Sequence, residues 1–446
     1  MRFEDIAAFA LEPLDVPEDA MDMAATLLID TLGVGAGAVG LHSGRIARDH
    51  AVRFMAAGTE ADAATMLFDG RRASVPGAAF ALATQIDNLD AHDGYNPTKG
   101  HIGCAVVPAL CAFGEAMPDL SARDALAALV MSYELSARAA LSLHATVSDY
   151  HTSGAWNALG VAALGARLRG MDAGALRHAL GIAEYHGPRS QMMREIANPT
   201  MLHDGSGMGA LVGAMAVLLA EDGFEGAPAI TVEAPEVAEH WADLGDSWIV
   251  TQNYIKPYPI CRWAHAAIDA LGGLMDTHGL AVDDIARIDV NTFAQAASLF
   301  AGVPDTTSQA QYSLAFALAV RSVHGWIGPG HVSGAGLRDA AVADVLPRIT
   351  ITEDARHSSR FPLGRWSDVT LHLRDGRTLA SGDVHARGGP EAPMSLEEVE
   401  AKFHAISGPL PKARRDAIWD MRAQMLRPGT RFADLLAQLH DPISDT

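Results

Sequence analysis

The chain has 446 residues, 49% of them hydrophobic and 20% charged, so it can bury a large core and is predicted to divide into two domains. Asp and Glu number 54 against 33 Lys and Arg, and the formal charge of −21 disfavours binding to nucleic acid or to an anionic membrane. The same charge repels anionic substrates, so a site for a carboxylic acid must concentrate its cations locally.

Three widely spaced cysteines, Cys104, Cys111 and Cys261, form no C-x-x-C pair, which argues against a zinc or iron–sulfur centre and suits a reducing compartment. The first residues are acidic where a secretory signal needs a basic end. The most apolar long stretch, 205–220, is shorter than the roughly 20 residues that a membrane span needs. We therefore expect a cytoplasmic protein with no membrane segment.

Helical periodicity dominates roughly the first 265 residues. Met21, Leu28 and Leu32 recur at helical spacing within 17–33, and Pro17 with two acids occupies the first turn. The abundant Ala and Gly permit close helix packing, and the β-branched runs typical of strands are missing. Further helices are predicted at about 75–87, 105–116, 122–143, 154–168, 173–184, 205–222 and 264–278.

Strand patterns begin after about residue 280. The segments 285–293, 346–354 and 366–386 alternate apolar with polar residues, and Asp375-Gly376 is a hairpin turn signal. A helix is predicted at about 308–324, and helical periodicity returns from Ser395. The predicted fold is mainly α: a large all-helical domain, 1–264 and 395–446, with a smaller α+β lid domain, 265–394.

The segment between the helices at 75–87 and 105–116 has the highest density of polar side chains. Its Gly and Pro residues predict an irregular loop, which is a common location for a site when packed helices hold it. A solvated loop with capping acids is the structural alternative. A metal site is a third reading, but no recognisable ligand spacing supports it, and we expect no metal. The polar residues are Asp87, Asp90, His92, Asp93, Tyr95, Lys99 and His101.

A second candidate segment places His144 and His151 before a helix that begins near Ser153. Helix N-termini favour anions, so a histidine here could donate or accept a proton beside a bound carboxylate. The alternative is a surface or capping histidine.

A third candidate segment, QNYIKPYPICRWAHAAIDA, brings Lys256, Arg262 and His265 within ten residues. In so acidic a chain, this cluster matches the need to bind carboxylates, with Arg as a bidentate fork and Lys as a point charge. The alternative is a rigid interdomain connection whose bases pair with surface acids.

Two weaker candidates complete the set. His203 stands just before the apolar stretch 205–220, with Arg189 and Arg194 upstream, and a lone histidine there is more often structural. Tyr312 could present its hydroxyl to a cleft, although an aromatic residue on an apolar helix usually belongs to the core.

Taken together, these segments resemble the MmgE/PrpD family, which includes 2-methylcitrate dehydratase, cis-aconitate decarboxylase and iminodisuccinate epimerase. The resemblance runs nearly end to end. Its most specific parts are the Asp-rich loop with a His before G-x-x-V-x-P-A-L, from Asp90 through His101 to Leu110, and the run K-P-Y-P-x-C-R-x-x-H-x-A-I-D, from Lys256 to Asp269. Fainter support comes from DGSGMGALVGAMAVLLAEDGFEGAPA and QYSLAFALA.

The resemblance implies a homodimer without a cofactor, whose active site lies between a helical domain and a lid. Its catalytic positions carry over to Asp90, His101, His151 and Lys256, and its substrate-binding positions include Tyr312. Together with these, we expect His203, Arg262 and His265 to contact a small di- or tricarboxylate.

Two departures from the family pattern bear on the substrate. Many relatives have Lys in place of His203 and Thr in place of Gly94, and the loop carries an extra residue before His101. Loss of a fixed cation at His203 favours a smaller or differently substituted acid, so His203→Lys is expected to improve activity on a tricarboxylate.

The shared chemistry is removal of a proton beside a carboxylate, with cations to stabilise the enolate. We favour a lyase of the 2-methylcitrate dehydratase type, with His101 or His151 as the base and the other as the acid. Alternatives are an iminodisuccinate-type epimerase, a cis-aconitate-type decarboxylase and a non-catalytic carboxylate-binding protein of the same fold.

Overall fold

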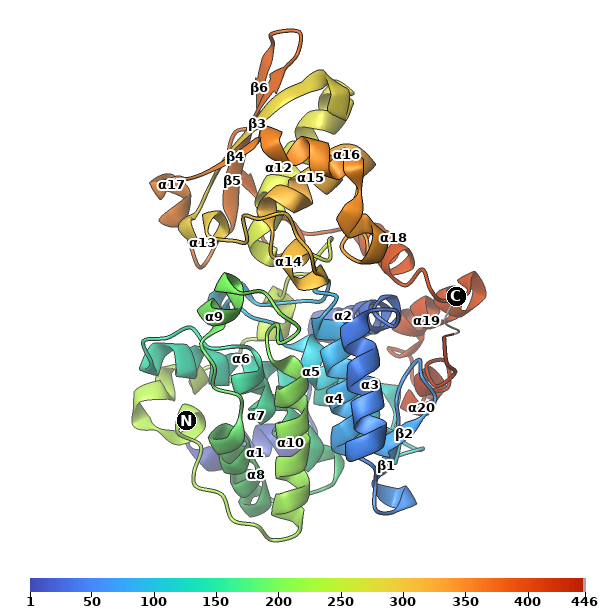
Figure 1. Cartoon of the computed structure of the whole chain (residues 1–446). Helices are drawn as coiled ribbons and strands as arrows, with labels where there is room; N and C mark the ends of the chain where they lie inside the picture. Colours follow the sequence, from blue (N-terminus) through green and yellow to red (C-terminus); the bar gives the residue numbers. More distant parts are fainter. Residues whose placement is uncertain (444–446) are drawn as a thin grey trace.

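Two separate clusters of buried apolar side chains organise the chain. The structure is a computed structural model that describes residues 1–443. The first cluster draws on residues 6–255 and 399–439, and the second on 260–373 together with Met192 and Ile196. Figure 1 shows the first as a helical body and the second as a smaller α/β part above it. The domain boundaries at 264 and 395 stay a prediction.

The helical body is packed through small residues. A Cβ added to Gly209 would lie 2.7 Å from the Cα of Gly154, so α7 and α10 approach backbone to backbone. The longest helix, α6, has a stretch long and apolar enough to cross a membrane, but 94% of that stretch is buried within the protein, as in a core helix. The helices are α1 Phe3–Leu11, α2 Glu18–Gly37, α3 His42–Phe54, α4 Val75–Asp87, α5 Gly103–Gly114, α6 Ala122–Thr146, α7 Gly154–Leu168, α8 Ala173–His186, α9 Met192–Ala197, α10 Ser206–Glu221 and α11 Ile230–Glu233.

The prediction that this body is all-helical is wrong in one place. Strands β1 (Ala63–Thr65) and β2 (Arg72–Ser74) pair antiparallel between α3 and α4. Each has only three residues, too few for a period-two pattern to stand out in the sequence. The chain reverses between them with Phe68 at φ 63° and Gly70 at φ 78°, both in the left-handed region.

The α/β part contains a sheet of order β4-β3-β5-β6, with β7 also paired to β5. The β3–β4 pair is parallel and the others are antiparallel. The predicted strand segments form, and Gly376 turns the β5–β6 hairpin at φ 89°. The elements are α12 His265–His278, β3 Ile285–Thr292, α13 Ala294–Ala297, α14 Thr307–Gln311, α15 Leu314–His324, α16 Ala340–Val345, β4 Ile349–Glu353, α17 Ala355–Ser358, β5 Trp366–Leu373, β6 Thr378–Ala380 and β7 Val384–His385.

The helix predicted at about 308–324 is two helices. The break falls at Tyr312, and the Ser313 side chain caps α15 by accepting a hydrogen bond from the Phe316 amide at 3.3 Å. The break therefore takes Tyr312 out of a regular helix, and its side chain is only 2% exposed.

The C-terminal helices, which the sequence predicts from Ser395 onward, pack on the helical body. They are α18 (Leu396–Ile406), α19 (Lys412–Gln424) and α20 (Phe432–Leu436). Phe403 packs so closely on Gly33 that an added Cβ would lie 2.4 Å from its ring. On the same helix, the buried Lys402 ammonium contacts Asp30 at 2.5 Å and the Ala91 carbonyl at 2.7 Å. The C-terminal segment thus supports the Asp-rich loop.

Candidate active site

The Asp-rich loop connects α4 to α5 and is almost entirely buried. Asp90 and Lys99 adopt left-handed conformations, with φ of 57° and 56°. Gly94 pairs with Tyr254 through two backbone hydrogen bonds of 3.0 and 2.8 Å. A Cβ at Gly94 would lie 2.3 Å from the Tyr254 hydroxyl, so the glycine is required by the tyrosine packed on it. The departure from Thr at this position is therefore tied to Tyr254.

Lys256 joins the third sequence segment to this loop. Its ammonium donates to the Asp90 carboxylate and, at 3.2 Å, to the Asp90 carbonyl. Both side chains are buried, and burial raises the pKa of Asp90 to about 6 although the Lys256 charge opposes that rise. Asp90 is thus poised to change charge close to neutral pH.

His101 is held as a neutral base. Its Nδ1–H donates to the Asp93 carbonyl at 2.6 Å, because a carbonyl can only accept, and this leaves the Nε2 lone pair free. Burial, reinforced by the Lys256 charge, holds the His101 pKa well below its ordinary value. Two bonds from the second segment fix the backbone: its amide donates to Ser153 Oγ at 3.0 Å, and Asn157 Nδ2 donates to its carbonyl at 2.8 Å.

Asp204 faces His101 from the turn before α10. Its Oδ2 lies 3.9 Å from His101 Nε2, and its Oδ1 accepts a 2.6 Å bond from the Ser153 hydroxyl. Burial raises the pKa of Asp204 above its ordinary value. The pKa of this acid and that of His101 are therefore shifted in opposite directions, an arrangement typical of acid–base catalysis.

These groups meet in a small closed cavity between the helical body and the α/β part. Its volume is about 20 Å³, enough for about one water molecule and too small for a polycarboxylic acid. A ligand of that size could enter only if the walls moved apart. The lining residues are Asp90, Lys99, His101, Tyr150, Met192, Ile196, Asp204, Tyr254, Cys261, Arg262, Trp263, Tyr312 and Arg365.

Arg262 lines this cavity, and its predicted role in binding substrate stays a prediction. Its guanidinium donates to the carbonyls of Arg387 at 2.6 Å and Ala386 at 3.0 Å, and stacks 4.1 Å from the Tyr254 ring centroid. Burial lowers the pKa of Arg262. Tyr312 also lines the cavity, and burial raises the pKa of its hydroxyl, which remains a hydrogen-bond donor at neutral pH.

His203 and His265 lie beside the cavity but do not line it. His203 packs 5.5 Å from the Tyr312 ring, with Nε2 3.4 Å from Ser308 Oγ, and burial lowers its pKa to about 3. It is therefore uncharged at neutral pH, in line with the expected loss of a cation here. His265 begins α12 and donates through Nε2 to the Ile260 carbonyl at 2.8 Å, a structural bond. Direct substrate contact by either histidine stays a prediction.

His151 is not brought to the cavity. The cavity is lined instead by its neighbour Tyr150, whose hydroxyl donates to the Lys99 carbonyl. The His151 amide donates to His144 Nε2 at 3.4 Å, and burial and the nearby Arg189 lower the His151 pKa. A catalytic role for His151 stays a prediction that this geometry does not support.

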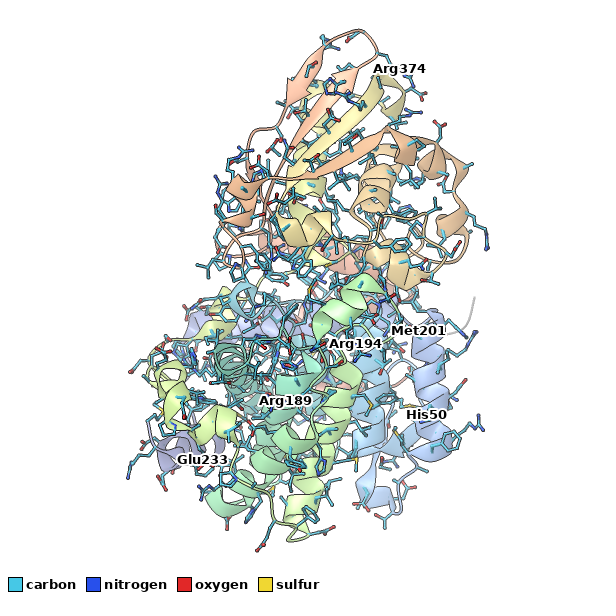
Figure 2. The ribbon with its side chains drawn as sticks, turned by 60° about the vertical axis from the view of Figure 1, so that its left-hand side comes forward. His50, Arg189, Arg194, Met201, Glu233 and Arg374 are labelled. Carbon is cyan, nitrogen blue, oxygen red and sulfur yellow. The ribbon has the colours of Figure 1, made fainter. Side chains whose placement is uncertain are left out.

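A larger surface pocket adjoins the cavity. It has a volume of about 710 Å³ and is lined by residues of α9 and of the segment that leads to α10. Met192 and Ile196 of α9 face the closed cavity, whereas Met193 and Arg194 face the pocket, so this short helix separates the two. Figure 2 shows Arg194 close to the junction between the body and the α/β part, with Arg189 lower on the body.

The Asp-rich loop also gathers potential metal ligands. Single ligand atoms of Asp90, His92 and His101 lie within 4.8 Å of one another, as do those of Asp87, His92 and Cys104. In the first group, the Lys256 ammonium already neutralises Asp90 and would repel a cation. In the second, Cys104 is buried, and burial raises its pKa well above the ordinary value, which disfavours the thiolate that binds metals.

Sequence reasoning missed four residues that line the cavity with polar groups: Tyr150, Asp204, Tyr254 and Arg365. Asp204 directly follows His203, one of the two weaker candidates, and Tyr254 stands two residues before Lys256. Proximity to these candidate residues could have indicated both. Arg365 lies in an unremarked turn, FPLGRW, which carried no signal of its own.

The helical body is joined to a smaller α/β part, and acids, bases and cations are enclosed at their junction. This architecture is typical of an enzyme whose active site lies between two lobes. The model of the MmgE/PrpD N-terminal domain matches residues 4–243, and that of the C-terminal domain matches 258–425. The chain belongs to the MmgE/PrpD family.

Two curated relatives are similar at low identity. The human protein named cis-aconitate decarboxylase is 23% identical over 381 residues, covering 80% of this chain and 76% of its own. The Aspergillus oryzae cis-aconitate decarboxylase-like protein oryM is 23% identical over 478 residues, covering 96% of this chain and 94% of its own. These relatives support an enzyme of the lyase type.

Proposed function

We propose that the protein is a lyase of the 2-methylcitrate dehydratase type, which removes a proton beside a carboxylate of a small polycarboxylic acid and eliminates water. The observation that carries this proposal is the free Nε2 of a neutral His101 in a closed cavity that also contains Arg262. A neutral imidazole can accept the proton, and nearby cations stabilise the enolate charge that develops.

In this scheme His101 Nε2 accepts the proton from carbon, and Asp204 donates a proton to the departing hydroxyl so that it leaves as water. Asp204 replaces His151 as the proposed acid because it lines the cavity and its raised pKa favours the protonated form. Transfer of a proton from the His101 imidazolium to the Asp204 carboxylate, 3.9 Å apart, restores both groups.

The decisive experiment is a substrate panel with purified protein: citrate, 2-methylcitrate, cis-aconitate, iminodisuccinate and tartrate analogues. Dehydration produces a conjugated alkene that absorbs in the ultraviolet. We expect this absorbance to rise with at least one hydroxy acid, and His101→Asn to slow the rise by about 10²- to 10⁴-fold. Absence of alkene from every hydroxy acid would refute the dehydratase.

Decarboxylation is the second candidate, favoured by the names of the two curated relatives. It would release carbon dioxide from cis-aconitate without prior loss of water. An epimerase, the third possibility, would instead exchange the α-proton for solvent deuterium while the acid keeps its composition. The same panel separates all three, and if none of the signals appears, the protein is a non-catalytic carboxylate binder.

We also propose that the protein acts as a cytoplasmic homodimer. Exposed apolar side chains gather at the start of α10 and along it, where a second copy could cover them. Light scattering should give twice the mass of the chain, and Met215→Asp should shift it to the monomer; a monomeric wild type would refute the dimer. The exposed residues are Met201, Leu202, Met208 and Met215.

A further inference from the structure

Three cations in the cavity have no carboxylate partner. Within residues 1–443, Lys99, Arg262 and Arg365 take part in no ion pair, although the chain carries 54 acids against 33 Lys and Arg. A further cation, Lys256, does not line the cavity but is paired with Asp90, which does. Arg262 and Arg365 are buried and Lys99 is half-buried. In so acidic a chain, such bases without an ion-pair partner indicate that the carboxylate comes from a ligand.

Arg365 is the most deeply buried of the three, at 1% exposure. Its guanidinium donates to main-chain carbonyls, among them Asn96 at 3.3 Å, while its Nε has no hydrogen-bond partner among residues 1–443. The group stacks 4.7 Å from the Phe361 ring. Burial lowers the pKa of Arg365 to about 10, so it keeps its charge at neutral pH. Such a charge is costly to bury without an anion, and neither the carbonyls nor the ring supplies one.

The cluster is assembled from both parts of the chain. Lys99 belongs to the Asp-rich loop, whereas Arg365 immediately precedes β5 of the sheet. The Arg365–Asn96 bond therefore spans the junction, and the cluster is complete only when the two parts are together. Because the cavity is too small for a polycarboxylic acid, the substrate must move its walls apart to enter, and the cluster is complete around it only when the two parts are together again.

We propose that Arg365, together with Arg262 and Lys99, binds a second carboxylate of the substrate, away from the carbon that loses its proton to His101. The inference rests on the proposed function for the location of the reacting carbon, but not for the anion site itself. The site selects acids with at least two carboxylates, because a monocarboxylate that engages the reacting centre leaves the Arg365 cluster without an anion. Arg365 thus determines specificity and couples substrate binding to closure.

Binding tests this proposal without reference to turnover. Tricarballylate, succinate and propionate, which carry three, two and one carboxylates, are titrated by calorimetry into wild type, Arg365→Met and Arg365→Lys. Wild type should bind the first two far more tightly than propionate. Arg365→Met should weaken tricarballylate binding by about 10- to 150-fold, the range for losing hydrogen bonds to a charged group, and leave propionate nearly unchanged. Arg365→Lys keeps the charge but loses the fork, and should fall between them.

Arg360→Met is the matched control, since Arg360 lies five residues upstream in the same turn but pairs with Asp383 and stacks on Trp366. It should bind all three acids as wild type does. If Arg365→Met fails to fold, the Arg365→Lys variant tests the proposal instead. The proposal would be overturned if Arg365→Lys bound tricarballylate as tightly as wild type and kept the same preference over propionate, or if Arg365→Met bound all three acids as wild type does. If the Arg365 variants lose binding while no acid in the substrate panel reacts, the anion site stands and the proposed lyase activity fails.

Discussion

Replacing Lys256 with Met tests the energetics of the buried pair with Asp90. The ammonium is fully buried, and the Asp90 Oδ2 already has no hydrogen-bond partner, so the substitution leaves a carboxylate with no compensating charge. Breaking a buried pair by removing one partner costs about 3–5 kcal/mol. Protonation of Asp90 limits that cost, because a neutral carboxylic acid is far cheaper to bury than a carboxylate.

The penalty should therefore depend on pH. With Lys256 present, the Asp90 pKa is about 6, so at pH 5 Asp90 is already mostly protonated and the ion pair contributes little. We expect Lys256→Met to lower the free energy of unfolding by about 3–5 kcal/mol at pH 8 and by about 1 kcal/mol at pH 5. The double variant Lys256→Met/Asp90→Asn should recover most of the loss at pH 8, because it buries no charge there.

Urea unfolding followed by tryptophan fluorescence at the two pH values measures these differences. Neither variant should be active, which separates the catalytic role of the pair from its effect on stability. An equal loss at pH 5 and pH 8, or a double variant less stable than Lys256→Met at pH 8, would refute the assignment of Asp90 as the titrating partner.

Four further outcomes are expected. His101→Asn should lower kcat by about 10²- to 10⁴-fold, which is the usual contribution of a general base. His151 lies outside the cavity, so His151→Asn should lower kcat much less. The reverse order of effects in steady-state assays would contradict the assignment of His101 as the base. The value of kcat/KM should fall below about pH 6, because Asp90 is protonated as the pH drops through its raised pKa, and Lys256 then loses its charged partner. His101 stays neutral over this range because its pKa is lowered. A kcat/KM that is constant down to pH 5 would argue against this explanation. Gly94→Thr should destabilise the protein by about 1–3 kcal/mol, because its Cβ would clash with the Tyr254 hydroxyl and the Gly100 carbonyl. Introduced into a Tyr254→Ala chain, Gly94→Thr should cost less than in wild type, because only the Gly100 clash remains; thermal unfolding of both single variants and the double variant measures the difference. Lys402→Met should lower kcat more than it changes KM, because the Lys402 ammonium holds the Ala91 carbonyl beside Asp90. The variant should also lose about 3–5 kcal/mol of stability, because its buried partner Asp30 is left without a counter-charge. An unchanged kcat would show that the loop does not need this support.

The candidate site was predictable where residue type and spacing carry the chemistry. Asp90, His101 and Arg262 all line one cavity, and Lys256 is joined to it through its ion pair with Asp90. Asp90 and Arg262 are 172 positions apart in the sequence, which is the difference between their numbers. The sequence did not indicate Asp204 and Arg365 as site residues, because the residues that they contact in the cavity are far from them in the sequence. His151 shows the opposite error: it stands beside the site in sequence, but the chain directs Tyr150 into the cavity instead.

The sequence by itself determined the local structure and the family of this protein. Helical and alternating periodicity follow from which face of an element is buried, so α4, α7, α18 and the strands β3 to β5 form where the pattern predicts them. The tertiary structure alone decided which charges are paired and which are left open. Ion pairing depends on distances of a few ångströms between segments that are remote in the chain. Burial lowers the pKa of His101 and raises that of Asp204, and these side chains are buried only once both parts have packed around the cavity.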